Sequence, residues 1–541
     1  MSASDAQVQP HADPAQPPAK TRAQTAGYLF AAMFIALSQA LGQGFLSANI
    51  TTLAGELGAT VSDTTWLMVV FMAPRAALPL ILIKVRTQYG LRRFAEVSIV
   101  VYAVVAGISL FATDLRSALL VELLSGIAAA PLSTLAFMYM LEPLSPQKKL
   151  SLGLPLALTF MSLGIPLGRA LSPILLENSN WQNLLLIKLG MSMTCLALVF
   201  RLPLISGERM KVIERLDLLS FSLITASFAG FVACFTTGAT YWWTSTPWIG
   251  VAMAGAIGTL VAAFLIELQR KSPLVDVRWL MTPAMLQFTA ALFLFRIILS
   301  EQTSGAPGLF QALGYSAAQM APLFWVISAA TLAGGLVCCL VLTPQRVPLI
   351  HLAALALIAF GAHLDAQANS QIAPSSMYLS QAIIGFAAAL FLPSAMAIGL
   401  VSALMRGPQY ILSFIIVFLS SQVLGATIGS GIFRTLIFMR TKAHAQWLNE
   451  HLVTGDGMVN QRLAQIATTL SHSISDTALL KVQTAKQLGI VVSQQATVAA
   501  YNDIFHMISL LALFAMAVLA GHILHMTMRK RMAGTPPVPA Q

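Results

Sequence analysis

Fourteen long apolar stretches, each of about 18 to 27 residues, occupy most of this chain between Gly27 and Met528. An α-helix of about 20 apolar residues crosses the roughly 30 Å hydrocarbon core of a bilayer. Because lipid offers no hydrogen bonds to the backbone, only helices and closed barrels can span it. The sequence therefore predicts an all-α polytopic membrane protein. Its expected spans are 27–50, 62–83, 95–112, 117–140, 151–174, 182–200, 219–237, 246–267, 284–305, 319–342, 348–366, 377–402, 409–435 and 503–528.

The composition agrees with a membrane protein. Of the 541 residues, 57% are hydrophobic and only 9% are charged, which excludes a soluble globular domain. The net charge of +11 lies in short loops between spans and not in one patch, so no nucleic-acid partner is predicted. The four cysteines fall within spans, and the histidines lack companion ligands, so neither a disulfide framework nor a metal site is expected. No phosphate-binding loop or enzyme motif is present, which predicts no cofactor and no enzymatic activity.

Positive charge predicts the orientation, because Lys and Arg concentrate in cytoplasmic loops. One set of loops carries Lys84, Arg86, Arg92, Arg93, Lys148, Lys149, Arg201, Arg209, Lys211, Arg215, Arg270, Lys271, Arg278, Arg346 and Arg406. The opposite short loops hold Glu56, Asp63, Asp114, Arg116, Glu177 and Asp365. Both termini are therefore expected in the cytoplasm. The long connection 436–502 is expected outside, as a short helical hairpin.

A series of short motifs follows a fixed order from the fourth span to the last. They are Gly126–Pro131, Leu216-Asp217, Thr237-Gly238, Trp242-Trp243, Pro273–Arg278, Gln311, Gly314–Ser316, Gln319, Leu424-Gly425, Ile428-Gly429, Gln495-Ala496, Ala500-Tyr501, Asp503 and Phe505. Each motif is short, but their order and spacing over almost the whole chain after residue 27 resemble one family. This is the fourteen-span EmrB/QacA-type drug:proton antiporter branch of the major facilitator superfamily.

The resemblance implies two six-helix bundles around a central cavity, with two extra helices inserted between them. Alternating access by rocking of the halves and a binding site near the midplane would follow. The expected divisions are a disordered cytoplasmic N-terminus at 1–26, an N-terminal bundle at 27–200, a linker with the inserted helices at 201–283, a C-terminal bundle at 284–528 that includes the periplasmic loop 436–502, and a cytoplasmic tail at 529–541.

The chain departs from the family pattern at its charged positions. Gly44 stands where span one usually has an acidic residue, five positions before Asn49. The loop after span two, expected to act as a conformational switch, keeps Gly90, Arg92 and Arg93. However, Thr87 replaces its usual Asp.

Spans four, five and thirteen also differ from the family. Glu122 replaces an arginine in span four, and Gln422 replaces another in span thirteen. The span-five motif reads Gly164, Gly168 and Arg169, with its prolines displaced to Pro166 and Pro173. The resemblance therefore leaves the usual proton pathway without its usual residues.

Charged residues at membrane depth become the functional candidates. A charge at the centre of a membrane helix costs about 2.5–3.5 kcal/mol, so it normally faces a bundle interior or a water-filled cavity. Glu122 is the predicted proton-coupling carboxylate, with Arg75 and Arg169 as its candidate partners; the alternative is a fixed ion pair that holds spans two, four and five together. Glu301, nearer the outer end of span nine, is the second proton candidate. The charge partners at membrane depth are Arg75, Arg169, Lys188 and Arg296.

Alternatives stay open for two of these cations. Arg169 and Lys188 could attract an anionic substrate. Otherwise Lys188 would extend outward to the interface, and Arg169 would bond backbone carbonyls near Pro166 and Pro173.

Polar and apolar side chains in spans one and two are the substrate-cavity candidates. They are Gln39, Gln43, Asn49, Trp66, Met68 and Phe71. The polar members could instead bond neighbouring helices, and the apolar members could be core packing.

The predicted function is secondary active, proton-coupled efflux of amphipathic or aromatic compounds, of multidrug type, across a bacterial inner membrane. The alternatives are a uniporter or organic-anion exporter without the usual proton coupling, and a transport-inactive sensor or assembly relative. The expected partners are a small-molecule substrate and the lipid bilayer. The resemblance leaves open a periplasmic adaptor protein and an outer-membrane channel.

Overall fold

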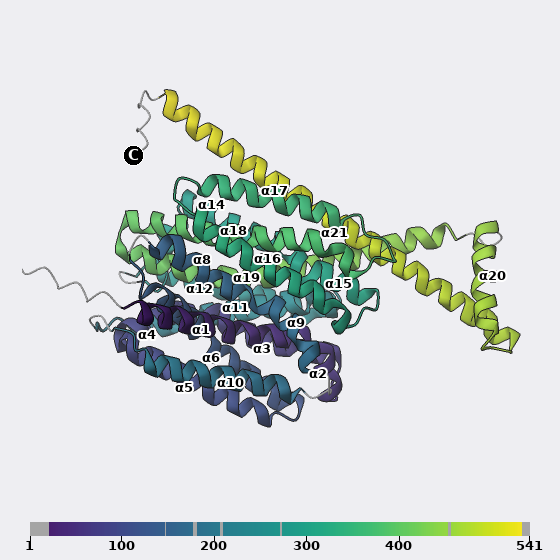
Figure 1. The fold of residues 1–541 in the computed structure, drawn as a ribbon, viewed down its shortest axis with the longest axis horizontal. Coiled ribbons are helices and arrows are strands. Elements are labelled where there is room, and N and C mark those ends of the chain that lie inside the picture. Colours follow the sequence, from purple (N-terminus) through teal and green to yellow (C-terminus); the bar gives the residue numbers. More distant parts are fainter. Residues whose placement is uncertain are drawn as a thin grey trace, which may run out of the picture.

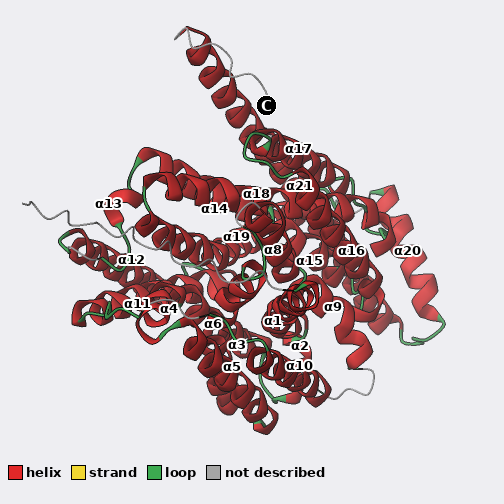
Figure 2. Cartoon of the chain, turned by 60° about the vertical axis from the view of Figure 1, so that its left-hand side comes forward, coloured by secondary structure: helices red, strands yellow, loops and turns green. Residues whose placement is uncertain are grey.

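The computed structural model of the chain describes residues 21–145, 148–176, 181–205, 209–270, 273–452 and 456–532. Within these ranges the structure is helical and contains no strand (Figure 2). Most of the predicted disordered N-terminus (1–26) and most of the tail (529–541) lie outside the described residues. The first helix begins at Arg22, inside the segment predicted to be disordered, and Thr21 caps it by accepting from the Gln24 amide.

The helices follow the hydropathy pattern closely. Among the described residues, thirteen helices are long and apolar enough to cross a membrane, and the bent pair α3–α4 can supply a fourteenth span. The elements are α1 (Arg22–Ala48), α2 (Ile50–Glu56), α3 (Val61–Ala77), α4 (Pro79–Tyr89), α5 (Leu91–Ile108), η1 (Ser109–Phe111), α6 (Leu115–Leu141), η2 (Lys149–Gly153), α8 (Leu154–Ser162), α9 (Gly164–Leu175), α10 (Gln182–Arg201), α11 (Arg215–Tyr241), α12 (Pro247–Leu268), α13 (Val277–Leu280), α14 (Pro283–Ile298), η3 (Glu301–Gly305), α15 (Ala306–Ala312), α16 (Ala317–Val341), α17 (Val347–Asp365), η4 (Pro374–Met377), α18 (Tyr378–Arg406), α19 (Pro408–Glu450), α20 (Gly457–Ser471) and α21 (Thr477–Met532).

Three spans are interrupted. The second bends by 50° between α3 and α4, where Pro74 and Pro79 each remove a backbone hydrogen bond. The fifth starts with a π-helical turn, η2, and breaks again at Leu163 between α8 and α9. The ninth carries a second π-helical segment, η3, between α14 and α15. Such π segments often occur at functional sites.

The helices form two halves that meet along one face. In the N-terminal half α1 packs on α6, α9 and α10, and α5 packs on α6 and α10. In the C-terminal half α18 packs on α16 and α17, and α19 packs on α14 and α21. The halves touch where α8 and α9 meet α16 and where α3 and α4 meet α19. Figure 1 shows α5, α6 and α10 at the bottom and α14, α17 and α18 at the top.

The inserted helices α11 and α12 pack on each other, and α11 also packs on α3 and on α19. They lie side by side at one edge of the molecule (Figure 2). A helix from each half therefore rests against α11, so the inserted pair covers the junction between the halves.

The helical hairpin predicted within 436–502 is present, because α20 packs on α21, but it is continuous with the neighbouring spans. Helix α19 continues without a break to Glu450, and the last helix already begins at Thr477. Between them lies α20, which forms part of an arm projecting beyond the bundle (Figure 1). We call the described residues 436–452 and 456–502 the arm. Near its base Arg440 and His444 both contact the carboxylate of Asp503, which joins α19 to α21.

Candidate functional site

Arg75 lies at the end of α3, just before the bend of the second span. Its Nη1 donates to Oε1 of Gln43 at 2.5 Å, and its Nη2 donates to Oε1 of Gln39 at 2.6 Å. Its guanidinium also lies 5.1 Å from the ring centroid of Phe71. The side chain is 8% exposed. Two neutral amides therefore hold this buried cation, and Glu122 does not contact it.

Glu122 has a different neighbour from the ones predicted. The positive charge that acts on it belongs to Lys188, whose Nζ donates to Oγ of Ser125, one turn along α6. Lys188 is buried and does not extend outward to the interface, contrary to one of the sequence alternatives. Glu122 lies at the wall of a cavity of about 390 Å³ within the N-terminal half, together with Trp181 and Leu185 of the α10 region. The structure thus separates Glu122 from both predicted partners.

Arg169 joins the two halves of the molecule. It follows the break between α8 and α9, and its Nη2 donates to the backbone carbonyl of Thr303 in η3 at 2.9 Å. The guanidinium lies 5.3 Å from the ring centroid of Phe324 on α16. Its buried Nη1 has no hydrogen-bond partner among the described residues. The sequence predicted carbonyls near Pro166 and Pro173, whereas the actual acceptor comes from the opposite half.

Glu301 is more deeply buried than the sequence indicated. It was expected near the outer interface, but it is 1% exposed within η3. Asp365, expected in an outer loop, is the last residue of α17 and is 2% exposed. Nε2 of Gln381 on α18 donates to Oε1 of Glu301 at 2.6 Å and to Oδ2 of Asp365 at 2.8 Å. Ser380 also donates to Asp365.

This carboxyl pair has no cation beside it. The two carboxyl groups are joined through Nε2 of Gln381, which donates to both. In the part of the chain that the structure describes, neither one is within 4.0 Å of a basic side chain. Oε2 of Glu301 and Oε1 of Gln381 are buried there without a hydrogen-bond partner. Sequence reasoning missed Asp365 and Gln381, because a residue at a span end is usually exposed and an amide carries no charge.

Two further arginines are held by neutral groups. Arg296 on α14 donates to Oε1 of Gln422 on α19, the position where the family usually has an arginine. Arg434 on α19 donates to the backbone carbonyl of Thr236 on α11. In the described parts of the chain, no carboxylate lies within 4.0 Å of the predicted charge partner Arg296.

Glycines bring spans one and five into direct backbone contact. A Cβ added at Gly44 would lie 2.2 Å from the carbonyl oxygen of Gly164, and a Cβ at Gly168 would lie 2.7 Å from the Gly44 backbone. An acidic side chain at position 44 has no room in this packing. Asn49 donates to Oγ of Ser172 at 2.8 Å, close to Pro173, so it also joins these two spans.

The remaining apolar cavity candidates pack within the bundle. Trp66 donates to the hydroxyl of Tyr241 at 3.4 Å, and its ring lies 5.6 Å from that of Trp248, so it faces the inserted helices. Met68 packs against the apolar cluster that contains Phe71.

The predicted switch loop is a tight turn. Gly90 has a φ of 87°, in the region that favours glycine, and it separates α4 from α5. Arg92 pairs with Glu96 at 2.8 Å on the surface, and Arg93 is exposed.

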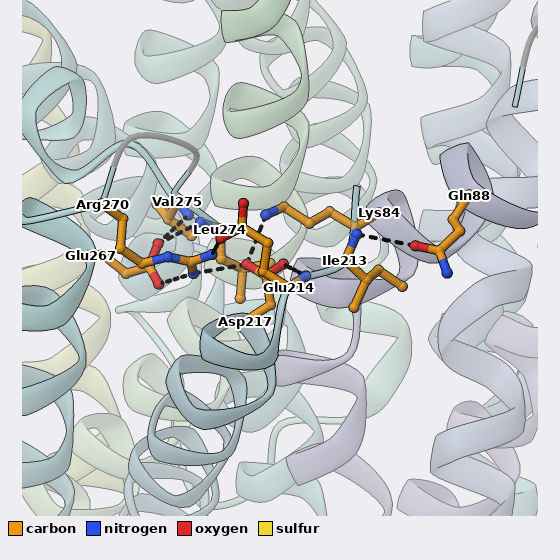
Figure 3. A network of polar contacts seen from close by, with 9 residues as sticks. All are labelled: Lys84, Gln88, Ile213, Glu214, Asp217, Glu267, Arg270, Leu274 and Val275. Carbon is orange, nitrogen blue, oxygen red and sulfur yellow. Dashed lines mark hydrogen bonds and ion pairs between the residues drawn. The ribbon is translucent and has the colours of Figure 1, made fainter. Parts of the chain in front are cut away.

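A buried charge network fixes the inserted helices to α4 (Figure 3). Asp217 at the start of α11 is fully buried and contacts Nζ of Lys84 at 2.7 Å and Nη1 of Arg270 at 2.8 Å. Arg270, just after α12, also pairs with Glu267 at 2.8 Å and with Glu214 at 2.9 Å. Burial alone would lower the pKa of the Arg270 guanidinium, but hydrogen bonds to these carboxylates outweigh that effect and raise it. From the sequence, Lys84 and Arg270 indicate only the orientation of the loops, and their pairing with Asp217 is not predicted.

Comparisons with known proteins agree with a transporter fold. No family model matches the chain. The multidrug export protein EmrB of Haemophilus influenzae is 24% identical over 249 residues, which are 44% of this chain and 46% of EmrB. The chain thus matches about half the length of this relative.

Solved structures cover nearly the whole chain. The human organic anion transporter MFSD10 (TETRAN) matches 93% of this chain and all of its own, with a TM-score of 0.56 and 13% identity. A POT family transporter in complex with 5-aminolevulinic acid matches 91% of this chain and 96% of its own, with a TM-score of 0.54 and 13% identity. These neighbours are transporters and not enzymes. The chain is an all-α polytopic membrane protein with the major facilitator fold, as the sequence resemblance predicted.

Proposed function

We propose that this protein is a secondary active transporter that exports amphipathic or aromatic compounds across a bacterial inner membrane by proton-coupled alternating access. One observation carries the proposal: three interrupted spans each carry a charged residue at the interruption or within two helical turns of it. These residues are Arg75 at the α3–α4 bend, Arg169 after the α8–α9 break, and Glu301 in η3. Irregular backbone at membrane depth is tolerated where it lies within protein or lines a cavity, and discontinuous helices often mark the substrate site of secondary transporters.

The contact between the halves supports alternating access. Arg169 of the N-terminal half donates to the Thr303 carbonyl of the C-terminal half. A single hydrogen bond to a carbonyl is easily exchanged for one to water, so this contact can open when the halves rock apart. The partial match to EmrB, whose name describes multidrug export, supports outward transport of drug-like compounds.

Organic anions are a second candidate substrate class. Arg75, Arg169, Arg296 and Arg434 are held only by amide and carbonyl oxygens in the described structure. Charged side chains within a membrane normally pair with an opposite charge or a backbone carbonyl, and they mark substrate pathways. An anionic substrate would supply the charge that these arginines lack, and the neighbour MFSD10 is named as an organic anion transporter.

Transport into inverted membrane vesicles tests both candidates. Vesicles with an acidic lumen should accumulate a cationic or neutral aromatic dye, and a protonophore should abolish that accumulation. A carboxylated dye tests the anion candidate, and Arg75→Gln should reduce its uptake more than that of the cation. If no dye accumulates above the level of vesicles without the protein, proton-coupled efflux is refuted and the transport-inactive alternative is favoured.

A further inference from the structure

We infer that Glu301, Asp365 and Gln381 form the proton-binding site of this transporter, in place of the Glu122 site that the sequence predicted. The inference rests on the proposed proton-coupled function and names the groups that perform it. The three residues come from spans nine, eleven and twelve, all in the C-terminal half. They are 1%, 2% and 0% exposed, so water does not screen their charges.

The site has too few hydrogen-bond donors for its buried oxygen atoms. A single amide nitrogen, Nε2 of Gln381, serves both carboxyl groups, at 2.6 and 2.8 Å. Oε2 of Glu301 and Oε1 of Gln381 remain buried without partners. A proton bound to one carboxyl group provides an O–H that can donate to a neighbouring oxygen, and it reduces the charge of the pair from about −2 to −1.

The site suits a proton better than a metal ion. A cation such as Na⁺ would need oxygens around it, but the centre of this site is an N–H group pointing at both carboxyl groups. The chemical step is simple: an O–H bond forms when a proton enters from water on one side, and it breaks when the proton leaves to the other side.

Glu122 is less suited to this role. Lys188 supplies a positive charge that attracts its carboxylate. It also lies within the N-terminal half, where it lines a cavity of about 390 Å³ between α2, α6 and α10. No basic side chain of the described residues lies within 4.0 Å of the carboxyl pair, so a bound proton changes the electrostatic energy of the pair more than that of Glu122.

The pair can act on the contact between the halves through η3. Glu301 and Thr303 lie in the same five-residue π-helical segment, and Arg169 holds the Thr303 carbonyl with one nitrogen while its Nη1 has no partner. Loss or gain of the proton changes the charge and the hydrogen bonding of η3, the segment whose Thr303 carbonyl holds Arg169. A shift of η3 on protonation would therefore act directly on the contact between α9 and η3.

Other titratable groups lie around η3 and must be considered in any pH response. Within the described residues, titratable groups on the elements that pack against η3 or carry the site include His351, His363, Tyr378, Arg434, Tyr501, Asp503 and His506. Arg169 reaches η3 from α9, and Arg296 precedes it on the same span. Arg434 bonds a carbonyl of α11, and Tyr501 places its hydroxyl against Gly308. His363 and His506 pack against each other on exposed faces of α17 and α21. None of these histidines is within 4.0 Å of the carboxyl pair.

The test uses the full-length protein in liposomes and compares Glu301→Gln and Asp365→Asn with the parent. In each variant, dye accumulation driven by a pH gradient should fall by at least about tenfold. The rate at which labelled dye exchanges for unlabelled dye without a gradient should stay within about threefold of the parental rate. Glu96→Gln, a surface substitution outside the site, serves as the control. Replacing all Na⁺ with choline should change nothing.

Several results would overturn the inference. One is gradient-driven accumulation by both variants at the parental rate. Another is loss of coupling in Glu122→Gln while Glu301→Gln stays coupled, which would restore the sequence prediction. A requirement for Na⁺ would replace the proton with a metal ion.

A direct titration keeps the inference testable if transport fails. The detergent-purified parent should bind about one more proton than Glu301→Gln when the pH is lowered, measured with an indicator dye in unbuffered solution. If the parent transports nothing, the proposed function fails, but this difference still decides the site. If one variant does not purify as a folded monodisperse protein, the other decides.

Discussion

Replacing Asp217 by Asn should strongly destabilise the protein. The side chain is fully buried and binds Nζ of Lys84, Nη1 of Arg270 and the backbone amide of Glu214. Asn preserves the size but removes the negative charge that the two cations share. Breaking a buried ion pair by removing one partner costs about 3–5 kcal/mol. Because Arg270 keeps Glu267 and Glu214, we expect the lower end, about 3 kcal/mol, which is roughly a 150-fold change in the unfolding equilibrium.

Unfolding in mixed micelles, followed by circular dichroism as SDS is added, measures this free energy by linear extrapolation. The matched control is Glu96→Gln, which breaks the Arg92–Glu96 pair at the surface and should cost less than about 0.5 kcal/mol. The double variant Asp217→Asn, Lys84→Met should lose less free energy of unfolding than the two single variants lose together, by at least about 1 kcal/mol. The reasoning is refuted if Asp217→Asn costs no more than the surface control, or if the two losses simply add.

Two further predictions concern contacts between spans. Gly168→Ala should destabilise the protein by about 1–3 kcal/mol in the same assay, because its Cβ would lie 2.7 Å from the Gly44 backbone. The control Gly190→Ala should not destabilise it, because a Cβ at Gly190 meets nothing within 4 Å. An equal effect of the two substitutions would contradict the close approach of spans one and five. Arg169→Met should remove the hydrogen bond to Thr303 and widen the distance distribution between spin labels on the C-terminal ends of α9 and α15. An unchanged distribution would show that this bond does not hold the halves together.

The spans could be predicted because each is set by a local property, the length of its apolar run. The expected span 182–200, for example, corresponds to α10 (Gln182–Arg201). The arm could not be predicted in its observed form. Its polar composition ends the hydropathy signal near residue 435, although nothing in that composition prevents the helix from continuing to Glu450.

The pairing of charges depends on helix rotation and on contacts between distant spans, which one sequence does not reveal. Glu122, Arg75 and Arg169 were grouped because they share a depth, yet Arg75 faces Gln39 and Gln43 of span one. Asp365 was assigned to a loop because it ends an apolar run. Only the fold shows that α18 covers it and brings Gln381 to it.

A rotation of the C-terminal half produces a larger displacement at the tip of the arm than in the core. Residues 436–450 extend α19 by about 22 Å at 1.5 Å per residue, and α21 runs alongside them down to the core of the C-terminal half. Because both helices are continuous with spans that pack in that half, a tilt of the half must swing α20 through an arc proportional to the length of the arm (Figure 1). A fluorophore on α20 would therefore magnify small rotations of the C-terminal half and report the transport cycle in real time.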